Sequence, residues 1–100
     1  MIPYLLRPKA QEDLGNIADF SFEKWGRDQE ESYLRMLQSS FQSISENPYL
    51  GRSVDDVVPG LHRFLAGRHI ILYFITGSHI DIVRILHHSM DILLHVDYLK

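Results

Sequence analysis

Two arginines, a tyrosine and a histidine in the C-terminal forty residues are of types that can catalyse chemistry on phosphate esters. Arg63 and Arg84 could stabilise the charge on a phosphate, and Tyr73 or His87 could act beside them as acid or base. Such a constellation would cleave a phosphodiester bond. The competing interpretation of His87 is a histidine at the end of a strand that makes structural hydrogen bonds only.

Arg84 stands inside an apolar run, where an unpaired guanidinium is costly to bury. It is therefore either an exposed cation that pairs with a carboxylate of a binding partner, or one half of an internal ion pair, for instance with Asp91 or Asp81. Arg63 has the same two interpretations. The residue types alone leave both open.

Three further residues recur at every fourth position: His87, Asp91 and His95. On a helix this spacing would place them on one face, as metal ligands require. Because the chain has no cysteine, no thiolate can join them. Solvated polar residues are the favoured interpretation, and we expect no metal site and no cofactor.

Residues 61–91 contain the elements that must position these side chains. Three apolar runs, rich in β-branched and aromatic residues, are separated by Gly67-Arg68 and by Gly77-Ser78. The separations are too short for a crossover helix, so the runs predict an antiparallel meander of three strands. Gly77-Ser78 predicts a two-residue type II′ turn with glycine first.

Alternation along the last strand predicts which side chains share a face. Both faces of this strand are substantially apolar, so we expect both to be covered, one of them by the C-terminal tail or by a partner. One face would carry Ile80, Ile82, Arg84 and Leu86, and the other would carry Asp81, Val83, Ile85 and His87.

The first sixty residues predict a strand followed by a helical hairpin. Residues 1–7 are expected to be extended, and an apolar stripe from Lys9 predicts a helix that ends at Gly26. A second helix is expected to start from a capping box of Asp28 and Glu31 and to stop at Asn47-Pro48. Residues 47–60 read as a long connection, and residues 92–99 have helical spacing. Trp25 and Phe41 are expected in the core.

The expected class is therefore α+β: an N-terminal strand, an αα-hairpin on one face of a mainly antiparallel sheet with a three-stranded C-terminal meander, and a short C-terminal helix. One hundred residues with 45% hydrophobic content predict a single domain spanning residues 1–100. The absence of cysteine, of a signal-peptide apolar region and of any membrane-spanning run predicts a cytoplasmic protein.

Charge is unevenly distributed along the chain. The net charge of −3 argues against binding to a nucleic-acid duplex. Residues 61–100, however, carry four Lys or Arg, three acids and all six histidines. We expect this half to attract an acidic partner.

Four segments in order resemble a known family: PKAQEDLGNIADF from Pro8, Trp25-Gly26, NPYLGRS from Asn47, and IVRILHHSMD from Ile82. The chain resembles the ParE branch of the ParE/RelE toxin superfamily. The resemblance implies the toxin of a type II toxin–antitoxin system, of the kind that stabilises plasmids. It implies binding to DNA gyrase without chemistry of its own. It also implies neutralisation by a ParD-like antitoxin, a ribbon-helix-helix protein whose C-terminal segment wraps the toxin.

The resemblance, together with the apolar second face, predicts two sets of contact residues. The antitoxin is expected to contact Arg63, Leu65, Tyr73, Ile80, Ile82, Arg84 and Leu86. Candidates for contact with the target are His87, Met90, Asp91 and His95.

The alternative is a RelE-like ribosome-dependent mRNA endoribonuclease. Several ribonuclease relatives place a tyrosine where this chain continues from His87 to Asp91 with HHSMD. This departure favours a toxin that acts by binding over a toxin that cleaves RNA.

Overall fold

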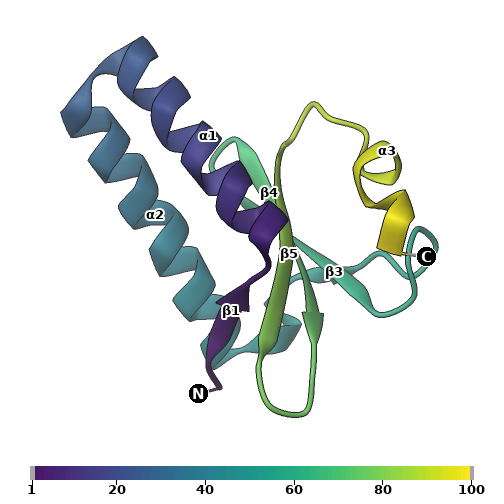
Figure 1. Ribbon diagram of the computed structural model, residues 1–100. Coiled ribbons are helices and arrows are strands. Elements are labelled where there is room, and N and C mark those ends of the chain that lie inside the picture. The colour runs from purple at the N-terminus through teal and green to yellow at the C-terminus, as the bar shows by residue number, and fades with distance from the viewer. Residues whose placement is uncertain (1, 100) are drawn as a thin grey trace.

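The computed structural model describes residues 2–99, and in it two helices lie against one face of a five-stranded sheet (Figure 1). The predicted α+β class is confirmed. The elements in chain order are β1 (Tyr4–Leu6), α1 (Pro8–Trp25), α2 (Arg27–Glu46), η1 (Pro48–Leu50), β2 (Arg52–Ser53), β3 (Leu61–Ala66), β4 (His69–Ile75), β5 (Ile80–His87), α3 (Ile92–Val96) and η2 (Asp97–Leu99). No helix within residues 2–99 combines the length and apolar character needed to cross a membrane.

The sheet confirms the predicted meander and extends it at both edges. Its order is β1-β5-β4-β3-β2, with β1 parallel to β5 and the other pairs antiparallel. The N-terminal strand thus lies beside the last strand, so that α1 begins next to β5 (Figure 1). The two-residue strand β2 was not predicted, because residues 47–60 carry the turn residues of a loop.

Gly26 separates the two helices of the hairpin with a positive φ of 86°. A side chain at this φ would be strained, which explains why glycine ends α1. The predicted capping box is wrong: α2 already begins at Arg27, and no side chain caps it. Asp28 therefore lies inside the first turn, where its negative charge interacts favourably with the helix dipole.

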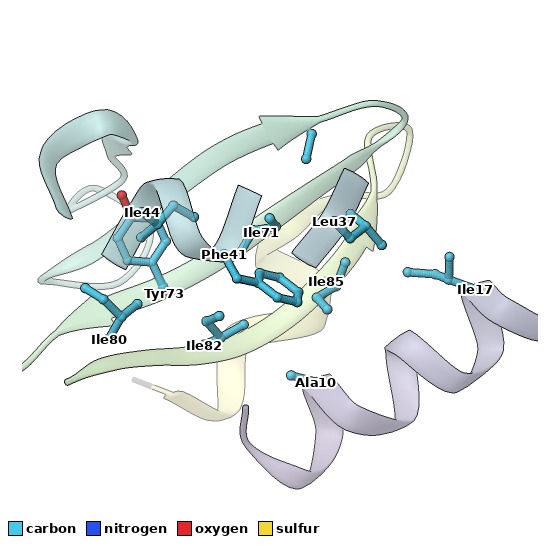
Figure 2. Close-up of a cluster of buried hydrophobic side chains, with 11 residues drawn as sticks. Ala10, Ile17, Leu37, Phe41, Ile44, Ile71, Tyr73, Ile80, Ile82 and Ile85 are labelled. Atoms are coloured by element: carbon cyan, nitrogen blue, oxygen red, sulfur yellow. The ribbon is translucent and has the colours of Figure 1, made fainter. Parts of the chain in front are cut away.

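The first hydrophobic core lies between the helical hairpin and the sheet. Figure 2 shows Leu37, Phe41 and Ile44 of α2 packed over the strands, with α1 alongside. These side chains are at most 3% exposed. Phe41 is confirmed as a core residue. The sheet contributes Ile71, Tyr73, Ile80, Ile82 and Ile85 to the same cluster.

A β-bulge in β5 corrects the predicted alternation. Tyr73 pairs with Ile82 and Leu72 pairs with Arg84, so Val83 is an extra residue on β5. Beyond the bulge the alternation is reversed. Ile82 therefore packs under the helices, whereas Leu86 belongs to the second core, so the predicted shared face of Ile80, Ile82, Arg84 and Leu86 is wrong.

The chain itself covers the second face of the sheet. Val54 and Val58 from the long connection, and Val96 from α3, pack on the sheet residues Leu61, Ile70, Leu72, Val83 and Leu86. The predicted C-terminal helix is confirmed, and the Asp91 carboxylate caps it by accepting from the Leu93 N–H at 3.1 Å. The tail, rather than a partner, is thus the second cover.

The β4–β5 connection differs from the predicted two-residue type II′ turn. Ile75 pairs with Ile80, so the loop contains four residues, and Gly77 does not have a positive φ. The Thr76 hydroxyl accepts from the backbone N–H groups of Ser78 and His79 instead. A threonine side chain therefore supplies the turn geometry that the prediction assigned to glycine.

A nearly buried ion pair joins α1, β5 and α3. The Asp13 carboxylate accepts from Arg84 Nε at 2.7 Å and from the Ile85 N–H at 2.9 Å, while Arg84 Nη1 donates to the His95 carbonyl at 3.1 Å. Both charged side chains are at most 15% exposed. Arg84 is thus internally paired, as one interpretation held, but the predicted partners Asp81 and Asp91 are wrong.

Those two carboxylates have other roles. Asp81 forms an ion pair with Arg7 at 2.8 Å, which ties the start of α1 to β5. Asp91 caps α3. The acid that pairs with Arg84 stands 71 positions away in sequence, beyond the reach of any local pattern.

We predict that Asp13→Ala lowers the free energy of unfolding by about 3 kcal/mol, because it leaves the Arg84 guanidinium nearly buried without its counter-charge. Urea denaturation measures the change. Glu31→Ala is the matched control, since it removes an exposed pair with Arg35 at 3.9 Å and should change stability by less than about 0.5 kcal/mol. Equal losses in the two variants would contradict a structural role for the Asp13–Arg84 pair.

Candidate functional site

A groove lies between α1 and the segment that follows β5. Its volume is about 480 Å³. α1 forms one wall, the end of β5 and residues 90–95 form the other, and the β3–β4 turn closes one end. Its size is that of a typical ligand or partner site. We refer to it as the α1 groove.

Exposed aromatic side chains lie at one end of the α1 groove. Phe20 and Trp25 are 58% and 44% exposed, and their ring centroids lie 5.7 Å apart. The Arg68 guanidinium stacks over the Trp25 ring at 4.4 Å. The prediction of Trp25 as a core residue is wrong, because the last turn of α1 directs its ring onto Arg68 rather than into the sheet core.

A hydrogen-bonded tyrosine and histidine form the floor beside Arg68. The Tyr33 hydroxyl accepts from the Arg68 N–H at 3.0 Å and lies 2.6 Å from His69 Nδ1. A hydroxyl both donates and accepts, so the Tyr33 side chain can bridge the Arg68 N–H and His69 Nδ1. Gly67 permits this approach: its φ is 59°, and a Cβ there would lie 2.9 Å from the Tyr33 hydroxyl.

His69 is held in its neutral form. Burial is the main cause that lowers its pKa to about 4, and the nearby His87 and Arg68 charges lower it further. His69 is therefore uncharged at neutral pH, and Arg68 supplies the positive charge at this end of the groove.

His87 lies next to His69, with ring centroids 5.4 Å apart, and stacks on His88 at 4.5 Å. Its Nδ1 lies 2.7 Å from the Ser89 hydroxyl. The structural hydrogen bond expected of a strand-end histidine is thus present. His87 nonetheless lines the groove.

The structure brings together three of the four predicted target-contact residues. His87, Met90 and His95 line the α1 groove, whereas Asp91 does not and instead caps α3. Met90 is 45% exposed, opposite the aromatic side chains of α1. How these residues engage a target stays a prediction.

The residues predicted to contact the antitoxin do not form one open surface. Tyr73, Ile80 and Ile82 are fully buried under the helical hairpin. The expected shared surface is therefore wrong: α2 packs over the face that carries these three residues, and the bulge at Val83 moves Leu86 to the opposite face. Arg84 and Leu86 are nearly buried but reach the wall of the groove, and only Arg63 and Leu65 are accessible on the outer face of β3.

The four residues that could have cleaved a phosphodiester bond are divided between two places. Arg84 and His87 line the groove, but Arg63 and Tyr73 do not. The Tyr73 hydroxyl donates to the Pro48 carbonyl at 2.7 Å and accepts from the Gly51 N–H at 3.0 Å, and burial raises the pKa of Tyr73.

Within residues 2–99, no three His, Cys, Asp or Glu side chains are arranged to hold a metal ion.

Several groove residues were not predicted as site residues from the sequence, among them Phe20, Trp25, Tyr33, Arg68 and His69. One available signal was that Phe20 falls outside the apolar stripe of the first helix, as an exposed contact residue would. Tyr33, Arg68 and His69 gave no local signal, since they come from α2 and the β3–β4 turn.

The fold and the groove define a small α+β protein with an open, largely apolar groove on its surface. A profile described as the ParE toxin of the type II toxin-antitoxin system parDE matches residues 4–92. Toxin ParE1 of Mycobacterium tuberculosis is 44% identical over 90 residues, which cover 89% of this chain and 92% of that protein. Toxin ParE1 of Caulobacter vibrioides is 34% identical over 96 residues, or 96% and 99% of the two chains.

The chain belongs to the ParE toxin family of type II toxin–antitoxin systems. A solved chain titled "Chromosomal ParDE TA system from P. aeruginosa" has the same fold, with a TM-score of 0.74 at 22% identity. The match covers 87% of this chain and 96% of that chain. The resemblance noted from the sequence is thereby confirmed.

We predict that Tyr73→Phe lowers the free energy of unfolding by about 1–3 kcal/mol, because the Gly51 N–H and the Pro48 carbonyl lose their shared partner. Thermal or urea denaturation measures the loss. Tyr49→Phe is the matched control, since Tyr49 is 75% exposed and its substitution should be nearly neutral. A stability of Tyr73→Phe equal to wild type would refute the structural role assigned to this hydroxyl.

We predict that His69 titrates near pH 4, as followed by the ring-proton resonances in an NMR titration and assigned with His69→Gln. An unfolded histidine takes up its proton near pH 6.5. The contribution of His69 to stability is therefore complete above pH 6.5 and is lost as the pH falls from there to about 4. In His69→Gln the free energy of unfolding should fall less over that interval. A midpoint near 6.5 for His69 would contradict the burial argument.

Proposed function

We propose that this protein acts by binding DNA gyrase in the cytoplasm and blocking it without chemistry of its own, and that a ParD-like antitoxin neutralises it. Membership of the ParE family supports the toxin role. The solved chain of the same fold comes from a ParDE toxin–antitoxin system, which supports pairing with an antitoxin.

The observation that carries the proposal is the character of the α1 groove. It exposes three large apolar side chains, Phe20, Trp25 and Met90, as in surfaces that bind proteins. Two of the four residues that could together cleave a phosphodiester bond are engaged elsewhere: Tyr73 is buried and hydrogen-bonded, and Arg84 is neutralised by Asp13. This arrangement favours binding over catalysis.

Two of the residues predicted to contact the antitoxin, Arg63 and Leu65, are accessible, and we propose that the antitoxin contacts them. Arg63 and Leu65 lie on the outer face of β3, and Leu65 is 60% exposed. The β3–β4 turn leads from Leu65 to Arg68, and the His88 N–H donates to the Arg68 carbonyl at 2.9 Å. An antitoxin segment could therefore pass from β3 over this turn into the groove.

We predict that the purified protein inhibits gyrase supercoiling, causes cleaved DNA to accumulate, and loses both effects when the antitoxin is added in equal amount. Met90→Asp should raise the concentration for half-inhibition at least tenfold, because it places a charge in the apolar contact. Leu5→Asp is the matched control: Leu5 is 59% exposed but does not line the groove.

Unaffected gyrase at saturating protein would refute the gyrase proposal. The next assay would then be primer extension on translated mRNA, which detects the ribosome-dependent cleavage of the RelE-like alternative. His69, His87 and Arg68, which lie together in the groove, are the residues to substitute in that case.

A further inference from the structure

One end of the α1 groove combines flat aromatic rings with an unpaired cation. Phe20 and Trp25 are both exposed there, with an angle of 81° between their ring planes. The Arg68 guanidinium lies over the Trp25 ring and forms no ion pair with any residue from 2 to 99. Nucleic-acid bases stack on exposed aromatic rings, and a free guanidinium binds phosphate.

We propose that this end of the α1 groove binds a nucleoside phosphate, with the base stacked against Phe20 and Trp25 and the phosphate held by Arg68 and His87. A free nucleotide and the end of a single strand share this chemistry. The site binds its ligand without making or breaking a bond. Neither gyrase nor an antitoxin is needed for this binding, which goes beyond the function proposed above.

His87 contributes an N–H donor to the same end of the groove. The Ser89 backbone N–H donates to His87 Nδ1 at 3.2 Å, so Nδ1 is the accepting nitrogen of the ring. The proton of the neutral imidazole therefore lies on Nε2, which can donate to a phosphate oxygen. The His69 ring contacts the His87 ring and directly follows Arg68 in the chain, so Arg68 and His87 flank it.

Arg68 is held in place before any ligand binds. Its N–H donates to the Tyr33 hydroxyl at 3.0 Å, and its carbonyl accepts from the His88 N–H at 2.9 Å. A second cavity of about 250 Å³ is lined by Trp25, Gln29, Tyr33 and Arg68. Because Arg68 also lines the α1 groove, its side chain is open to a ligand although its backbone is fixed. Little conformational freedom is then lost on binding.

The charges along the groove favour one orientation of the nucleotide. Among the described residues, the acids that line it are Glu12 and Asp13, both near the start of α1. Asp13 is neutralised by Arg84, and Glu12 lies roughly 12 Å along the helix axis from Phe20 at a rise of 1.5 Å per residue. A phosphate is therefore attracted to Arg68 and kept away from the Glu12 end.

An acidic peptide is the competing ligand, since its carboxylate also pairs with arginine. Two features favour the nucleotide. A phosphate group carries more negative charge than one carboxylate, and a base is a flat ring that stacks on the exposed aromatic side chains. The groove volume of about 480 Å³ is that of a small-ligand site.

The test uses Trp25, which is the only tryptophan of the chain, so its fluorescence reports on this site. Adenosine 5′-monophosphate added to the full-length protein should quench it saturably. Adenosine, which lacks the phosphate, and inorganic phosphate, which lacks the base, should each bind at least tenfold more weakly. Neither quenching nor a shift of any amide resonance at about 5 mM nucleotide, a concentration that detects even weak binding, would overturn the proposal.

Substitutions separate the two contacts. Arg68→Gln should weaken binding of the nucleotide at least tenfold and leave that of adenosine nearly unchanged, whereas Phe20→Leu should weaken both about fivefold. The matched controls are Arg27→Gln and Phe22→Leu. The Arg27 guanidinium lies over the Phe22 ring at 5.7 Å, and neither residue lines the groove, so both variants should bind as wild type does. Equal weakening of nucleotide and adenosine by Arg68→Gln would overturn the phosphate contact.

Two further ligands identify the source of the nucleotide. If the 5′-phosphorylated adenine trinucleotide binds at least tenfold more tightly than the mononucleotide, the site takes the end of a strand, and equal affinity identifies a free nucleotide. The dipeptide acetyl-phenylalanyl-glutamate offers a ring and a carboxylate. Binding of this dipeptide as tight as that of the nucleotide would overturn the proposal in favour of an acidic peptide. These measurements contain no gyrase, so their failure leaves the proposed function untouched.

Discussion

The ion pair between Asp13 and Arg84 is the interaction on which the arrangement of the site depends. One carboxylate accepts from the guanidinium and from the Ile85 N–H, and the same guanidinium donates to the His95 carbonyl. Three elements far apart in sequence are thereby fixed relative to one another: α1, the end of β5 and α3. Because a nearly buried charge needs its partner, these elements cannot separate without a large cost in free energy. The α1 groove is the space left between elements held in this way.

The bulge at Val83 makes this ion pair possible. It inserts one residue into β5 immediately before Arg84, and so it reverses the alternation of the strand at that point. Without the bulge, Arg84 would share the face of Ile82, which is fully buried against the helical hairpin. With it, Arg84 lies at the border between α1 and α3, where Asp13 can reach it. A local irregularity of the strand therefore decides both the sheet packing and the shape of the groove.

The meander, the helical hairpin and the C-terminal helix could be predicted because each depends on a short periodic pattern or on a glycine. The start of α2 and the turn at Gly77 were predicted wrongly, since other residues met the same local needs: Gly26 at the helix start and Thr76 in the turn. The bulge, the Asp13–Arg84 pair and the groove floor could not be predicted. They depend on contacts between residues up to 71 positions apart, which no window of the sequence displays.

The same reasoning explains why the apolar second face of the sheet was a misleading guide to the binding surface. Two apolar faces require two covers, and a chain of 100 residues supplies both, the second through residues 54–58 and α3. The apolar side chains that remain exposed after both cores are formed are a better guide to a binding surface. Two of them, Phe20 and Met90, lie on facing walls of the α1 groove. Neither side chain is needed to complete either core, and both remain in contact with water. Exposed apolar area of this kind is costly in a free protein, and burial beneath a partner removes that cost.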